Sequence, residues 1–476
     1  MSGQKLYRPG PGYWSWATVA VLALAARPSW SLAAAAIEGR LPDSWLAAGV
    51  RQAWQAVVPV RHVDKIQAWH LVDAYLVAIG SDGSVRVFAA DKGTHLWTQP
   101  MAEPLSNLFP PTVYQDGDLR AMVFTIRDRA VFLDPATGSQ FRRPHRLDNG
   151  DTELRPVGPV HLWAGPISPV VANGDHVFQA APRKRIRRYS ISRDIQNYQV
   201  GIDADIVLPP LCIPEKDLLV LADYNGTVAA TEIDTRRTVF TAELNARPLG
   251  WVAADEQALY VVTSGPRLHV LDLADGHERL EGYSRGFLLP AVPVEGPIVT
   301  SESVYVALEG DKLQRVGKEL RWPNWTATGV RRFLAEWPGR VALLAENGSI
   351  RFVRPETGET LTTVEPPVPG LDGLSNPLND AIFLTSARGE VRCLRPANAA
   401  PLKEADFRPV TTRPAGLPAD KTAVVAAPDA APTGEGKTTS EEASTGQETP
   451  AASTENTGPK LSPIEALIAD PLRSRR

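Results

Sequence analysis

The stretch Leu76–Trp97, LVAIGSDGSVRVFAADKGTHLW, sets the pattern for most of the chain. It opens with the apolar run Leu76–Ile79. After the tight turn Ser81–Gly83, small apolar residues alternate with polar or larger ones. A second turn, Asp91–Gly93, leads into a last short run that ends in tryptophan. These features predict three antiparallel strands joined by tight turns. A preceding strand over Ile66–Leu71 would complete a four-stranded sheet.

Imperfect copies of this pattern return along the chain until about residue 397. Each copy has a short apolar strand, a turn and a second apolar strand. The copies begin near Ala121, Val177, Leu218, Leu259, Val304, Val341 and Ile382. About eight units spaced roughly 40–50 residues apart are typical of four-stranded propeller blades. One unit cannot bury its faces alone, so the units should stack around an axis and close into a ring. We therefore predict an all-β fold, an eight-bladed β-propeller of four-stranded antiparallel blades.

The segment Leu133–Gly138, LDPATG, and its echo Leu271–Gly276, LDLADG, resemble the repeat of the pyrroloquinoline-quinone-type (PQQ-type) β-propellers, roughly A-L-D-x-x-T-G-x-x-x-W. The resemblance covers about residues 65–397 and implies that the last aromatic of each repeat docks on the next blade. The residues that it assigns to this docking are Trp97, Asp134, Gly138, Asp272, Gly276 and Gly358. At the tryptophan position of other repeats stand Arg142, Phe240, Leu280 and Thr362. Only Trp97 keeps the family residue.

The resemblance also bears on function. Catalytic members of this family hold the quinone between a tryptophan and a disulfide of adjacent cysteines, and they bind calcium through Glu, Asn and Asp. This sequence has no adjacent cysteines and no recognisable ligand trio. We therefore expect the non-catalytic branch, with no catalytic residue, cofactor or metal and with loops that hold a partner. Two alternatives stay open: a degenerate PQQ- and calcium-dependent oxidoreductase, and a carbohydrate-binding propeller whose Trp163, Trp251 or Trp337 stacks on sugars.

Composition narrows the class of partner. The formal net charge of −4 argues against binding nucleic acid, and the eight histidines show no spacing typical of a metal site. Cys212 and Cys393 fall in units that an eight-fold ring places nearly opposite each other. We expect two buried free thiols rather than a disulfide. One propeller, residues 61–408, accounts for most of the chain, and we expect it to be monomeric.

The two ends of the chain differ from the repeats. Residues 1–36 have the basic start, apolar run and small-residue end of a secretory signal peptide, which predicts export to the periplasm or cell envelope. A retained membrane anchor is the alternative, and no other stretch is apolar enough to span a bilayer. Residues 409–460 have a disordered composition. Residues 461–476 contain a capping box and a short apolar helix whose Ile464, Leu467 and Ile468 are candidates for docking another protein.

Residues 37–60 precede the repeats. We expect Asp43 to cap a helix that runs to about Val58, with Leu46, Val50 and Trp54 along one stripe and packed on a face of the propeller. Two segments, residues 61–70 and residues 401–408, are candidates for the strand that closes the last blade.

One dense charge run stands out, and it is the best candidate for binding a polyanion or an acidic partner. It consists of Arg183, Lys184, Arg185, Arg187 and Arg188. The alternative is a solvated outer strand whose arginines pair with local carboxylates. We expect the partner to be another envelope protein or a polyanion, bound without turnover.

Overall fold

The computed structural model describes residues 41–58, 64–104, 108–117, 119–146, 151–163, 165–181, 185–193, 195–201, 204–206, 208–279, 286–318 and 324–407. The predictions for the signal peptide, the linker, the docking residues Ile464, Leu467 and Ile468, and two members of the charge run, Arg183 and Lys184, therefore lie outside the described residues. Within them the fold is a β-propeller of four-stranded antiparallel sheets. The predicted fold class is confirmed.

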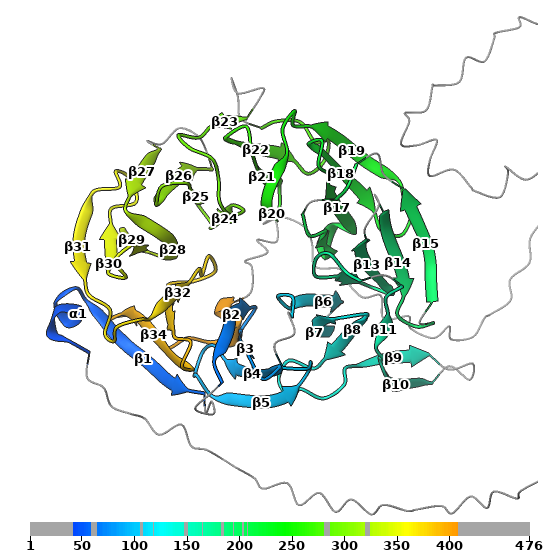
Figure 1. The fold of residues 1–476 in the computed structure, drawn as a ribbon, viewed down its shortest axis with the longest axis horizontal. Helices are drawn as coiled ribbons and strands as arrows, with labels where there is room; N and C mark the ends of the chain where they lie inside the picture. Colours follow the sequence, from blue (N-terminus) through cyan, green and yellow to red (C-terminus); the bar gives the residue numbers. More distant parts are fainter. Residues whose placement is uncertain are drawn as a thin grey trace, which may run out of the picture. The chain divides into compact units, whose positions relative to one another are not determined.

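The strands fall into sets of four, ordered from the inside of the ring to the outside (Figure 1). The first strands are β2 (Ile66–Val72), β6 (Thr112–Asp116), β12 (Val171–Asn173), β16 (Leu211–Ile213), β20 (Pro248–Ala254), β24 (Ile298–Val299), β28 (Val330–Trp337) and β32 (Asp372–Leu374). The second strands are β3 (Tyr75–Gly80), β7 (Leu119–Ile126), β13 (His176–Ala181), β17 (Leu218–Ala222), β21 (Ala258–Thr263), β25 (Ser303–Leu308), β29 (Arg340–Ala345) and β33 (Ile382–Thr385). The third strands are β4 (Ser84–Ala89), β8 (Arg129–Leu133), β14 (Arg185–Ser190), β18 (Thr227–Glu232), β22 (Arg267–Asp272), β26 (Lys312–Gly317), β30 (Ile350–Val353) and β34 (Glu390–Pro396). The outer strands are β5 (His95–Pro100), β11 (Val160–His161), β15 (Ile195–Gly201), β19 (Thr238–Glu243), β23 (Phe287–Leu288), β27 (Trp325–Thr328), β31 (Thr360–Val364) and β1 (Val50–Val57).

Six of these sets are separate four-stranded sheets, and the second and third sets form one eight-stranded sheet. They join where β6 and β12 pair in parallel, with Ala172 opposite Tyr114. Other neighbouring sets touch through their first strands, as β16 touches β20 and β32 touches β2. This arrangement is compatible with the predicted eight blades. A separate ribbon, β9 (Arg142–Arg146) paired with β10 (Thr152–Pro156), lies outside the second set.

The hydrophobic core consists of clusters between neighbouring sets. One cluster joins Val77 and Val87 of the first set to Phe124 of the second, and all three are fully or almost fully buried. Another joins Tyr305 of the sixth set to Phe333 of the seventh, whose rings stack with centroids 4.3 Å apart. Because second and third strands are buried on both faces, they read as nearly continuous apolar runs. The repeats were recognisable in the sequence for that reason.

The ring closes with the first strand of the chain. β1 pairs antiparallel with β34, from Val50 opposite Pro396 to Val57 opposite Glu390. It completes the last sheet, whose order is β1-β34-β33-β32. Residues near the two ends of the propeller are thus held in one sheet, and β1 covers the edge of β34. Neither predicted closing segment fills this role, since Ile66–Val72 is the inner strand of the first set and Glu404–Phe407 is a 3-10 helix.

The predicted helix from Asp43 to Val58 is wrong beyond its first turn. The helix α1 covers only Asp43–Ala47, and Pro42 rather than Asp43 stands at its N-cap. From Val50 to Val57 the chain is a strand, in which Val50 and Ala56 are buried. The same apolar residues fit a helical stripe or a strand face, and the free edge of β34 decides between them because it needs a fourth strand.

The turn Ser81–Gly83 of the first repeat is held by Asp82. Its Oδ1 accepts hydrogen bonds from the backbone N–H of Ser84 at 3.1 Å and from the Ser84 hydroxyl at 2.6 Å. Its Oδ2 accepts a bond from Nη2 of Arg86 at 2.8 Å. Burial alone would raise the pKa of Asp82, but the bonds from Arg86 and Ser84 outweigh it and lower the pKa to about 2.

The depressed pKa of this carboxylate predicts that the fold loses part of its stability in acid. In the unfolded chain Asp takes up its proton near pH 4. The stabilisation from a depressed pKa is therefore complete above about pH 4 and lost as the pH falls towards about 2. We expect Asp82→Asn to melt at a lower temperature than the wild type at pH 6 and the two to converge near pH 2. Melting curves that stay parallel between pH 6 and pH 2 would contradict this role.

No helix in the described part of the chain is long and apolar enough to cross a membrane.

Candidate binding surfaces

The residues that the repeat assigns to docking do lie between neighbouring sets. The indole of Trp97 packs on Gly138, where a Cβ atom would lie 2.6 Å from Cδ2 of the ring. Its Nε1 donates to the carbonyl of Pro135 at 2.9 Å. Asp134 closes the same turn, with Oδ1 accepting from the backbone N–H of Ala136 at 3.0 Å. The role of these residues is structural, because each set is fastened to the next.

The same contact recurs at other sets, including two that the sequence analysis missed. Trp325 packs on Gly358 and donates to the carbonyl of Pro355 at 2.7 Å. The pairs that share this geometry are Trp54 on Gly93, Trp97 on Gly138, Phe240 on Gly276 and Trp325 on Gly358. Asp272 holds the turn of the third pair by accepting from the N–H of Ala274 at 2.8 Å. The docking contact of Trp54 was not predicted because the sequence analysis assigned this residue to a helix.

The charge run does not form one surface in the described residues. β14 is the third strand of its set, so successive side chains point to opposite neighbours. Arg188 points towards the fourth set, is 5% exposed, and donates from Nη1 to the carbonyl of Ile233 at 3.0 Å. Arg185 and Arg187 alternate with it and are half-buried. The alternative of an outer strand is also wrong, because β15 covers β14. Fewer charges of this run are therefore accessible to a polyanion than the sequence analysis assumed.

Among the described residues, the most exposed aromatic side chain lies on the connection between β11 and β12. Trp163 is 74% exposed, although its neighbour Leu162 is buried. The backbone N–H of Trp163 donates to the hydroxyl of buried Tyr189 at 3.0 Å. At the other end of the connection, the N–H of Val170 donates to Thr125 Oγ1 at 2.9 Å. The loop is therefore anchored at both ends while it presents the indole to solvent.

The three tryptophans considered for sugar binding have different environments. Trp337 is 5% exposed and packs against Phe352, with ring centroids 5.1 Å apart, so it is a core residue. Trp251 is 39% exposed and its Nε1 donates to the carbonyl of Pro297 at 3.1 Å. Only Trp163 offers most of its ring. Trp337 is therefore unavailable for stacking on a sugar.

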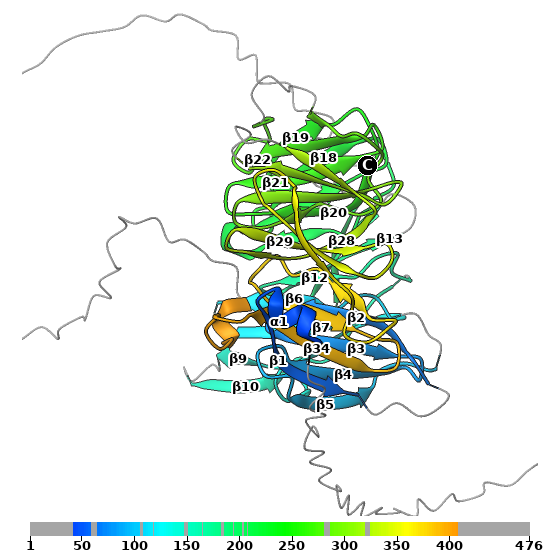
Figure 2. The same cartoon turned by 90° about the vertical axis from the view of Figure 1, so that its left-hand side faces the viewer.

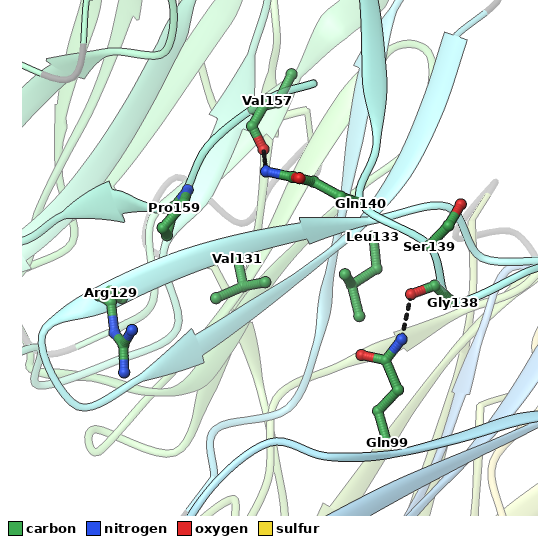
Figure 3. Close-up of a pocket in the computed structure, with 9 residues that line it drawn as sticks. All are labelled: Gln99, Arg129, Val131, Leu133, Gly138, Ser139, Gln140, Val157 and Pro159. Atoms are coloured by element: carbon green, nitrogen blue, oxygen red, sulfur yellow. Dashed lines mark hydrogen bonds between the residues drawn. The ribbon is translucent and has the colours of Figure 1, made fainter. Parts of the chain in front are cut away.

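A shallow hollow of about 360 Å³ lies on the outer side of the second set (Figure 3). Val131 and Leu133 of β8 line it from one side, and Val157 and Pro159 from the other. Gln140 closes one end by donating from Nε2 to the carbonyl of Val157 at 2.9 Å (Figure 3). The lining is mainly apolar, so the hollow is suited to an apolar side chain rather than to chemistry.

A second cavity, of about 380 Å³, is acidic. It lies at the turns of the second, third and fourth sets and includes Asp116, Glu215, Asp217 and Asp234. Burial raises the pKa of Asp217 above its ordinary value. No group of three or more His, Cys, Asp or Glu that could hold a metal ion occurs within the described residues.

Arg143 of the ribbon reaches the rim of this cavity. Its Nε lies 2.9 Å from Oδ2 of Asp116, and its Nη1 lies 2.9 Å from Oδ1 of Asp175. Burial alone would raise the pKa of Asp175, but bonds from Ser190 and Ser192 and the charge of Arg143 hold it below its ordinary value. Arg143 thereby ties the base of the ribbon to two sets.

The cysteines do not fit the quinone site of the catalytic relatives. Cys212 is on β16 and Cys393 on β34, and both are free thiols. Cys393 is buried, whereas Cys212 is only partly buried. Burial raises the pKa of both thiols, which makes them unreactive. The catalytic relatives hold the quinone against a disulfide of adjacent cysteines, and these two cysteines form no such disulfide, so they do not fit a quinone.

Comparison with known proteins agrees with this geometry. Residues 224–365 match the family model PQQ_2, described as outer membrane protein assembly factor BamB. The chain is a β-propeller with PQQ-like repeats. The crystal structure of BamB from Moraxella catarrhalis is similar to it with a TM-score of 0.51 and 13% identity, over 73% of this chain and 99% of that one. The C-terminal WD40 domain of Sif2 is similar with a TM-score of 0.51 and 10% identity, over 73% and 98% of the chains.

At these identities the solved structures establish the β-propeller fold and nothing finer. No curated protein sequence matches the chain. The match to the family model covers sets four to seven, where the docking pairs Phe240 with Gly276 and Trp325 with Gly358 lie.

Proposed function

We propose that this PQQ-like propeller is exported and acts as a protein-binding scaffold in the cell envelope, without catalysis and without a cofactor. Its fold resembles that of BamB, and its first 36 residues have the composition of a signal peptide. The partner is a protein that covers an exposed surface of the ring and undergoes no reaction there.

One observation carries the proposal: a large aromatic side chain stands exposed on an anchored loop. Trp163 is 74% exposed and Ile167, four residues on, is 47% exposed. Binding energy at protein interfaces concentrates in such residues, tryptophan above all, when they fill a pocket on the partner. The bond from the Trp163 N–H to Tyr189 fixes the backbone before binding, so less entropy is lost when the complex forms.

The proposal predicts that Trp163→Ala weakens capture of the native partner by about 30-fold or more, as expected for loss of a residue worth 2 kcal/mol at an interface. The mature protein and the variant would each be used to recover envelope proteins, which are compared by mass spectrometry. The melting temperature should stay unchanged, because the side chain is mostly exposed.

The matched control is Leu288→Ala on β23, since this side chain is 61% exposed but lies on a different set. It should recover partners as the wild type does. Equal recovery with Trp163→Ala would contradict the site. In a parallel sample the wild type is incubated with PQQ and calcium, and a stoichiometric quinone band in the absorption spectrum would favour the oxidoreductase alternative.

A further inference from the structure

The ribbon β9–β10 interrupts the outer strand of the second set. The N–H of Phe141 donates to the carbonyl of Phe132 at 3.0 Å, and β11 later resumes the pairing with Val160 opposite Ala130. Between these two points the chain runs out along β9 and back along β10. At the base of this ribbon, the N–H of Val157 donates to the carbonyl of Phe141 at 2.8 Å. In Figures 1 and 2 the ribbon projects from the ring with β10 on its outer side.

The backbone pairing of the ribbon leaves one open edge on β10. The bond from the Val157 N–H to the carbonyl of Phe141, which stands opposite it in the register, sets the alternation along the ribbon, so Leu154 with Pro144 is a non-hydrogen-bonded pair. The N–H and C=O of Leu154 therefore point away from β9. Pro156 falls in another such pair opposite Arg142. Pro144 on β9 and Pro156 on β10 each lack an N–H, so each edge of the ribbon loses one donor, while β10 keeps the outward N–H groups of Thr152 and Leu154. No strand in the described residues pairs with the outer edge of β10.

The side chains along this edge are complementary to themselves. Suppose that two copies of β10 pair antiparallel with Leu154 opposite Leu154. Glu153 of each copy then faces Arg155 of the other, so both cross-strand charge pairs are of opposite sign. Within one copy Arg155 Nε already lies 3.1 Å from Glu153 Oε2, so in the dimer this exposed ion pair is shared between the two copies. Thr152 faces Pro156, and its N–H can donate to that carbonyl. All five residues of β10 are exposed, and Leu154 is 55% exposed.

We propose that the outer edge of β10 is a dimerisation site whose occupant is β10 of a second copy of this chain. The two ribbons form one four-stranded sheet about a two-fold axis through the Leu154 pair, an isologous interface. The contact is small, so the dimer is weak, with a dissociation constant in the micromolar range or above. It is independent of Trp163, and Trp163→Ala should dimerise as the wild type does.

Cross-linking tests the register. Across a hydrogen-bonded antiparallel pair the Cα atoms are about 5.5 Å apart, within the range of a disulfide. We expect Leu154→Cys in the full mature chain to form a covalent dimer under mild oxidation. The control Thr152→Cys places the two thiols roughly 14 Å apart and should give no more dimer than the wild type, in which Cys212 and Cys393 are the free thiols.

Charge exchange tests the pairing itself, by sedimentation up to several hundred micromolar. Glu153→Arg and Arg155→Glu should each weaken the dimer about tenfold or more, because like charges then face each other. An equal mixture of these two variants should associate at least as well as the wild type, and the double variant should recover. The proposal is overturned if the wild type stays monomeric at every concentration and Leu154→Cys forms no covalent dimer. It is also overturned if the mixture of the two variants associates no more strongly than each variant alone.

Discussion

Replacing Trp45 with alanine is expected to lower the free energy of unfolding by about 3–5 kcal/mol, the cost of a large buried cavity. Trp45 lies on α1, just before the strand that closes the ring, and it is fully buried. It belongs to a cluster with Val50 of β1, Trp337 of β28 and Leu371. The cluster therefore joins the start of the propeller to its last two sets.

The loss includes a hydrogen bond as well as packing. Trp45 Nε1 donates to the carbonyl of Glu365 at 2.7 Å, and this carbonyl follows β31 in the seventh set. Without it β1 is held mainly by its pairing with β34, so the last sheet should open first on heating. We expect the melting temperature to fall by several degrees in circular dichroism.

The neighbouring residue gives a matched control. Leu46 lies on the same short helix but is 47% exposed. Leu46→Ala should change the free energy of unfolding by no more than about 0.5 kcal/mol, as surface substitutions usually do. Similar destabilisation by both variants would show that helix content, rather than closure of the ring, determines the effect.

Most of the sheet structure was predictable because its signals are local. The run at Leu218–Leu221 and the turn Asn225–Gly226 predicted β17, the turn and β18 of the fourth set. A short apolar run and an adjacent turn specify a hairpin without reference to the rest of the chain. The PQQ-like repeat added the docking of Trp97 on Gly138, which joins two sets.

The errors arose where a distant partner decides the structure. Val50–Val57 has apolar residues at spacings that suit a helix, and its strand partner β34 lies more than 330 residues further on. The charge run was treated as one patch because the sequence does not show that β15 covers β14. Alternation then separates Arg188 from Arg187 onto opposite faces.

The ribbon and the exposed loop were missed for a related reason. Arg142 was assigned to the end of a repeat, whereas it begins β9, because an insertion shifts the later residues out of the pattern. Trp163 was considered as a residue that stacks on sugars, and the sequence did not show that it stands exposed on a connection between sets. Insertions and loops carry no period, so pattern analysis places them poorly.

Gly358→Ala is expected to be strongly destabilising, because it adds a methyl group to one of the docking contacts. Gly358 has a φ of +70°, and a Cβ atom there would lie 2.7 Å from Cδ2 of Trp325. The backbone conformation costs alanine about 1–2 kcal/mol, and overpacking against the indole adds about 1–3 kcal/mol. Gly348, in another turn of the same sheet, has a φ of +85° and open space around it. Gly348→Ala should therefore show the conformational cost alone.

The indole itself supplies the decisive comparison. If the clash causes the extra loss, then Trp325→Ala should relieve it, and the double variant Trp325→Ala with Gly358→Ala should be destabilised by less than the sum of the single changes. The corresponding double variant with Gly348→Ala should be additive, because Gly348 has no heavy atom within 4 Å of its Cβ position. Urea unfolding of the five variants measures both couplings. Additivity at Gly358 would mean that the glycine is required for its backbone conformation and not for docking the aromatic side chain of the preceding set.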